Sequence, residues 1–67
     1  MPVKDVVEII EETRVEKGWT KAELSRRSGI RYDNLWATLR GYRRLPANEF
    51  IELCSQLDLG VDDFTEQ

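Results

Sequence analysis

The chain has 67 residues, 40% hydrophobic and 34% charged, with a formal charge of −3, which predicts one small globular domain over residues 1–67. No stretch approaches the roughly 18 consecutive apolar residues that span a membrane, and the start MPVKDVVEIIEE lacks the basic and apolar regions of a signal peptide. Cys54 is the only cysteine and histidine is absent, which excludes a disulfide framework, a zinc site and Cys–His or Ser–His catalysis, so we expect a cytoplasmic protein that is not an enzyme and needs no metal or cofactor.

A first helix is predicted from the start of the chain to about Lys17. Apolar residues recur at i, i+3, i+4 and i+7, the spacing of one helix face: Val3, Val6, Val7 and Ile10. Pro2 suits a first-turn position, and the early acids Asp5 and Glu8 complement the helix dipole. Gly18 supplies the stop.

A second helix is predicted to start at the stretch WTKAEL. Thr20 is expected at the N-cap, with Glu23 three residues later completing a reciprocal capping box. Trp19 before the cap and Leu24 after it stand at the positions of a hydrophobic staple. We therefore assign Trp19 to the core in preference to a binding surface.

A turn at Gly29 and a third helix over residues 32–40 are expected next. Gly29 permits the positive φ of a tight turn, and Ile30 follows it as an apolar anchor. The third helix should stop at Gly41 and bury three residues, Leu35, Thr38 and Leu39. Its outward face then carries Tyr32, Asp33, Trp36, Ala37 and Arg40, and a solvated helix seldom exposes two aromatic residues together.

A fourth helix is predicted to begin near Pro46 or Asn48. Its apolar stripe again has helical spacing: Phe50, Leu53, Cys54 and Leu57. We expect Cys54 to be a small buried apolar residue, and a short last turn at VDDF to close the core. No segment alternates with period two, so the predicted fold is an all-α bundle of four to five helices.

The order of these signals matches a helix-turn-helix over about residues 20–40. The segments KGWTKAELSRRSGI, RYDNLWATLRG, YRRLP and FIELCSQLDLGVDDF resemble the Cro/CI-type helix-turn-helix domain of phage repressors and related bacterial regulators. The resemblance extends over about residues 6–64. It implies a small DNA-binding regulator, similar to a Cro repressor, whose third helix enters the major groove.

One departure from the family affects the contact between the first and third helices. Where the family often has a glutamate that pairs with an arginine of the first helix, this chain has Leu39. Arg14 is present as that arginine, so we expect it to pair with Glu11 or with a C-terminal acid.

A second departure affects the start of the third helix. The family's usual capping serine is Arg31 here. We therefore expect Asp33 or Asn34 to cap this helix and to start it slightly later.

The charge distribution supports the same function. Residues 17–46 contain eight basic and two acidic side chains, a net charge of +6, whereas the rest of the chain carries −9. A phosphate-binding surface depends on the local field, so an acidic protein with a basic centre can still bind DNA. A basic face that is merely solvated remains the alternative.

The resemblance and the outward face of the third helix together give two sets of candidate residues. Candidates for base contacts are Arg31, Tyr32, Asp33, Asn34, Trp36, Ala37 and Arg40. Candidates for phosphate contacts are Thr20, Lys21, Tyr42, Arg43 and Arg44. For Trp36 three roles stay open: a base contact, a backbone contact or a partner interface. Tyr42 has packing within its loop as an alternative, and Arg26 with Arg27 is assigned to solvated surface.

We therefore expect a sequence-specific regulator of double-stranded DNA, with repression by operator occupancy as its mechanism. One small domain makes few contacts, so a homodimer on a palindromic operator is expected. Neither a membrane nor a small-molecule ligand is an expected partner. The alternative is a protein-interaction module, such as an antitoxin-type partner, with the exposed aromatic residues as anchors.

Overall fold

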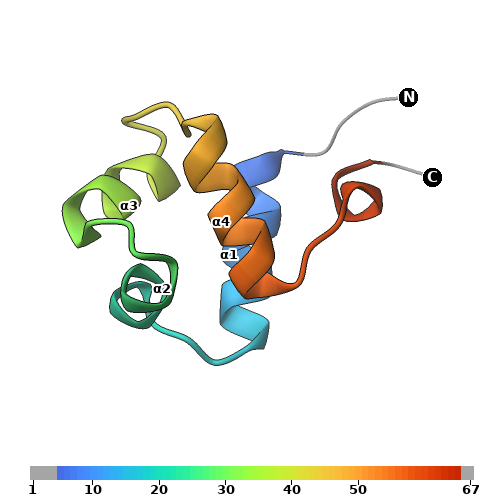
Figure 1. Cartoon of the computed structure of the whole chain (residues 1–67), viewed down its shortest axis with the longest axis horizontal. Helices are drawn as coiled ribbons and strands as arrows, with labels where there is room; N and C mark the ends of the chain where they lie inside the picture. Colours follow the sequence, from blue (N-terminus) through green and yellow to red (C-terminus); the bar gives the residue numbers. More distant parts are fainter. Residues whose placement is uncertain (1–4, 66–67) are drawn as a thin grey trace.

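The computed structural model describes residues 5–65, and its regular elements are all helical, as predicted (Figure 1). The helices are α1 (Val6–Glu16), α2 (Lys21–Ser28), α3 (Tyr32–Leu39) and α4 (Ala47–Leu57), followed by the 3-10 helix η1 (Val61–Phe64). In Figure 1, α1 and α4 overlap at the centre, α2 and α3 lie at one end of the long axis and η1 lies towards the other. No helix within residues 5–65 is long and apolar enough to cross a membrane.

The two ends of α1 are set by Asp5 and Gly18. The Asp5 carboxylate accepts from the Val7 N–H at 3.0 Å, so Asp5 is the N-cap and not a first-turn residue. The predicted contributions of Pro2 and Val3 lie outside the described residues. At the other end Gly18 has φ +75°, and the Trp19 N–H donates to the Arg14 carbonyl at 3.1 Å. This is the Schellman pattern, which confirms the predicted stop.

The start of α2 confirms half of the predicted capping box. Thr20 is the N-cap, and its hydroxyl accepts from the Glu23 N–H at 3.1 Å. The reciprocal half is wrong, because the Glu23 carboxylate binds Arg26 and Arg27 instead. Two guanidinium groups offer a stronger, charge-assisted partner than a backbone N–H. Trp19 is half-buried and packs against the core with the Arg27 guanidinium 4.3 Å from its ring centroid.

The core is a single cluster to which all four α-helices contribute. Its buried members are Ile10, Leu24, Ile30, Leu35, Leu39, Leu53 and Leu57. Phe64 of η1 is also buried, and its ring lies 5.3 Å from that of Phe50, measured between centroids. Each such side chain contributes about 1.5–3 kcal/mol of hydrophobic free energy. Cys54 is only half-buried, so the prediction that it is a buried apolar residue is confirmed only in part.

Two predictions were made where the sequence departs from the Cro/CI-type pattern, one about Arg14 and one about the start of α3. Arg14 pairs with Glu11 at 2.7 Å, one of the two expected partners, while Leu39 is buried in the core. The later start of α3 is wrong: the helix begins at Tyr32, and Arg31 occupies the N-cap position without a side-chain hydrogen bond.

Substitution of Leu24 tests the core. Leu24 is 0% exposed, so Leu24→Ala should cost about 2–5 kcal/mol through lost burial and a residual cavity. For a domain of this size each kcal/mol lowers the melting temperature by about 4–8 °C. Thermal unfolding followed by circular dichroism should therefore show a decrease of at least ~8 °C. Val15→Ala, at an exposed position of α1, is the control, and equal effects of the two changes would contradict the assigned core.

Candidate nucleic-acid interface

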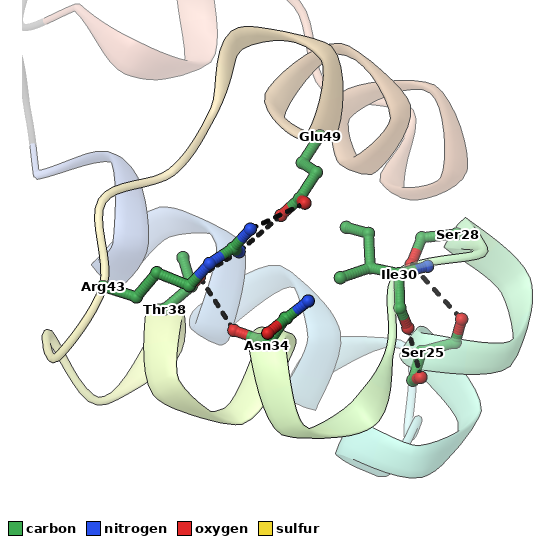
Figure 2. Close-up of polar contacts among 7 residues, drawn as sticks. All are labelled: Ser25, Ser28, Ile30, Asn34, Thr38, Arg43 and Glu49. Carbon is green, nitrogen blue, oxygen red and sulfur yellow. Dashed lines mark hydrogen bonds and ion pairs between the residues drawn. The ribbon is translucent and has the colours of Figure 1, made fainter.

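The turn between α2 and α3 is held by a glycine and two serines (Figure 2). Gly29 has φ +76°, a conformation that other residues adopt only at a cost. The Ser25 hydroxyl donates to the Ile30 carbonyl, and the Ser28 hydroxyl accepts from the Ile30 N–H at 3.3 Å. Ile30 is buried, so the turn is tied to the core two residues before α3 begins. These bonds fix the direction in which α3 leaves the turn.

The inner face of α3 is buried and its outer face is exposed, as the spacing predicts. Leu35, Thr38 and Leu39 are between 1% and 8% exposed. The exposed residues all come from the base-contact set: Arg31, Tyr32, Asp33, Trp36 and Arg40. The two remaining candidates, Asn34 and Ala37, are half-buried. The fold thus gathers seven candidates on one helix, with its five exposed ones available to a partner.

The end of α3 brings Trp36, Arg40 and Tyr42 together. The Tyr42 N–H donates to the Ala37 carbonyl at 2.8 Å, part of a Schellman turn in which Gly41 has φ +82°. This turn places the Tyr42 ring 6.0 Å from that of Trp36, and the Arg40 guanidinium lies 5.1 Å from the Trp36 ring. Trp36 remains 38% and Tyr42 72% exposed. The result is a protruding aromatic and cationic cluster beside the outer face of α3.

Arg43 has a different environment from the other candidate cations. Its guanidinium forms two hydrogen bonds with the Glu49 carboxylate, at 2.8 and 3.0 Å, and donates to the Thr38 hydroxyl at 3.1 Å (Figure 2). The hydrogen bonds from Arg43, opposed by partial burial, leave the pKa of Glu49 below its usual value, and the same contact raises the pKa of Arg43. Arg43 therefore connects the loop to α3 and α4, and its charge is largely neutralised.

Sequence reasoning missed Glu49 and the two serines of the turn. Glu49 lies in the first turn of α4, where an acid is also favoured by the helix dipole, so the sequence gives no sign of its pairing. Ser25 and Ser28 carry no distinctive signal in the sequence, although their hydroxyls close the turn. Such contacts depend on the three-dimensional path of the loop and have no periodic signature.

The ion pairs divide the basic residues into two groups. Within residues 5–65, Arg14, Arg26, Arg27 and Arg43 form ion pairs with Glu11, Glu23 or Glu49. The remaining basic side chains of that range take part in none of these pairs: Lys17, Lys21, Arg31, Arg40 and Arg44. Thr20 is exposed and Lys21 half-buried at the start of α2. The basic residues without an ion pair in this range thus include Lys21, the first residue of α2, and Arg31 and Arg40, which flank α3.

The described part of the chain has no group of three or more Cys, Asp or Glu side chains placed to hold a metal ion. Comparisons with protein-family models, with curated proteins and with solved structures returned no match.

The Arg43–Glu49 pair predicts a pH-dependent stability. Glu49→Gln should lower the free energy of unfolding at neutral pH by about 1–2 kcal/mol, because hydrogen bonds to charged groups contribute more than neutral ones. Since the pKa of Glu49 is lowered in the folded protein, its contribution is present above the usual carboxyl pKa and is lost as the pH falls through the folded value. Urea unfolding at several pH values should show the two proteins converging below about pH 4. A constant difference down to pH 2 would contradict this assignment, and Glu52→Gln, at an exposed position, is the control.

Proposed function

We propose that this protein binds double-stranded DNA in a sequence-specific manner and represses transcription by occupying an operator. The observation that carries the proposal is the exposed face of α3, whose opposite face is buried. Its aromatic residues lie between Arg31 and Arg40, which form no ion pair with any residue of the range 5–65. A helix that follows a helix-turn-helix turn fits the major groove with its outer face against base edges. No second observation of equal weight favours catalysis.

The proposed base contacts come from the outer face and both ends of α3. Tyr32, Asp33, Trp36 and Ala37 face the groove floor in this arrangement. An aspartate accepts from a cytosine amino group, while aromatic or methyl side chains contact thymine methyls. Arg31 and Arg40 at the two ends reach guanines or phosphates. Asn34 is half-buried, so its side-chain amide contacts an adenine edge only if α3 is rolled slightly.

The proposed phosphate contacts flank these positions. Thr20 and Lys21 lie at the N-terminus of α2, where the helix dipole favours an anion. Tyr42 and Arg44 lie in the loop after α3 and contact phosphates further along the groove. For Arg43 we propose a positioning role, because its guanidinium is held by Glu49.

The proposed assembly is a homodimer on a palindromic site. One helix-turn-helix makes few contacts, and two copies related by a two-fold axis contact half-sites one helical turn apart. The acidic remainder of the chain is repelled by phosphate, which disfavours wrong orientations. DNA binding of this kind places the protein in the cytoplasm or nucleoid of a bacterial host.

A protein-interaction module of the antitoxin type is the second candidate. The cluster of Trp36, Arg40 and Tyr42 favours it, since exposed tryptophan, tyrosine and arginine are the residues that dominate protein interfaces. In that case the same cluster would bind protein and the chain would show little affinity for DNA.

The salt dependence of DNA binding tests the proposed function. If each monomer contacts four to six phosphates, the logarithm of the binding constant should fall with that of salt concentration with a slope of about −4 to −5. Fluorescence anisotropy on labelled duplexes measures this slope. Lys21→Ala or Arg44→Ala should each reduce it by about one on specific and random DNA alike. Arg26→Ala is the control, because Arg26 pairs with Glu23; a slope near zero for the unaltered protein would contradict DNA binding.

Trp36 gives a separate test of base contact. Trp36→Ala should weaken binding to a selected site by about tenfold or more while affecting random DNA much less, since a lost base contact costs roughly 1–3 kcal/mol. Replacement of individual thymines by uracils in the duplex identifies any methyl group that Trp36 contacts. Ile51→Ala, at an exposed position of α4, should leave both affinities unchanged. Equal weakening on both DNAs would instead assign Trp36 to the backbone.

A further inference from the structure

An apolar groove lies away from α3, between the start of α1, the middle of α4 and the segment after α4. Its volume is about 460 Å³, in the range of pockets that accept large apolar groups. The side chains that line it are almost all apolar, among them Val6, Phe50, Ile51, Cys54, Val61 and Phe64. In Figure 1 η1 lies on the side of the central helices α1 and α4 that is away from α3. The proposed DNA contacts therefore make no use of this groove.

Two of the lining residues are unusually accessible for their type. Ile51 is 66% and Val61 79% exposed. Single exposed apolar residues are common on proteins, but here both belong to one continuous apolar surface with Phe50 and Phe64. Contiguous apolar surface of this kind marks sites of protein interaction.

The segment after α4 that borders the groove is acidic. Residues 58–65 contain three aspartates and no Lys or Arg. Asp63 lies at the rim, where its carboxylate accepts from the N–H of Gly60, a lining residue, at 2.7 Å. Burial and the nearby Asp63 raise the pKa of the Cys54 thiol in the groove. The exposed Asp62 stands between the lining residue Val61 and Asp63 in the chain.

We propose that this groove docks a basic amphipathic helix of a partner protein, whose apolar side chains enter the groove while its lysines or arginines meet the acidic rim. Helix-in-groove recognition requires an apolar surface of this kind on the receiving protein. A second copy of this chain fits less well, because a two-fold contact would bring the two acidic segments against each other. DNA is repelled by the same carboxylates, so the site is independent of the proposed function of α3.

Binding of defined peptides to the full chain tests this proposal. The probe is a fluorescent helical peptide of about 15 residues with leucines at i, i+3, i+4 and i+7 and lysines on the other face. Its control has glutamates in place of the lysines. We expect the lysine peptide to bind at least about tenfold more tightly than the control. Equal binding of the two peptides, or binding of neither, would overturn the proposal.

Variants locate the binding surface. The double change Ile51→Ser with Val61→Ser should weaken binding of the lysine peptide by about tenfold or more, as buried apolar contacts are lost. Asp62→Asn with Asp63→Asn should weaken it and reduce its salt dependence. Val15→Ser is the matched control: Val15 is 63% exposed beside the acids Glu11, Glu12 and Glu16 of α1, and its loss should have no effect. Thermal unfolding verifies that every variant is folded.

Two other occupants of the groove would overturn the proposal. If sedimentation shows a dimer that the Ile51→Ser, Val61→Ser variant dissociates, the groove holds a second copy. If the lysine peptide binds only after residues 1–4 are removed, the chain's own start occupies it. An effect of Val15→Ser as large as that of the groove variant would show binding to acidic surface in general.

Discussion

The burial of one face of α3 is the constraint on which the rest of the structure depends. Leu35 and Leu39 fix the rotation of the helix against α1 and α2, and the turn at Gly29 fixes its direction. Because the inner face is held at these points, the outer face has one orientation relative to the basic groups around it. A recognition helix requires such preorganisation, since base contacts depend on register with the groove.

The charges of the protein are arranged around this helix in two ways. Some arginines serve the fold: Arg43 connects the loop to Glu49, and Arg14 pairs with Glu11 near the end of α1. Others, such as Arg40 and Arg44, form no ion pair within the described residues and remain available to a partner. The acidic segment that contains Asp62 and Asp63 borders a separate apolar groove. One small domain thus presents two surfaces of opposite charge, suited to partners of different chemistry.

Much of the fold could be predicted from the sequence because it rests on local rules. The cap at Thr20, the positive φ at Gly18 and Gly29 and the apolar spacing of α4 all follow from neighbouring residues. The predictions that were wrong concern side chains that have more than one possible hydrogen-bond partner. Glu23 was expected to bind a backbone N–H and binds two arginines, a competition that local patterns do not resolve.

The candidate site was predicted in outline for the same reason. Helical spacing identifies the exposed residues of α3, but it gives no information on how loops fold back. The contact between Tyr42 and Trp36 and the pairing of Arg43 with Glu49 join segments through the path of the loop after α3. From the sequence, Arg43 and Arg44 are equally good candidates for phosphate contact. In the structure Arg43 pairs with Glu49, whereas Arg44 forms no ion pair with the described residues.

The central claim is that the outer face of α3 contacts the bases of a specific DNA site. Selection of bound duplexes from a random pool, followed by sequencing, tests it most directly. We predict enrichment of a short palindrome, and a changed preference at defined positions when the selection is repeated with Asp33→Asn. Recovery of unenriched sequence with the unaltered protein, under conditions in which the chain is folded, would contradict the claim.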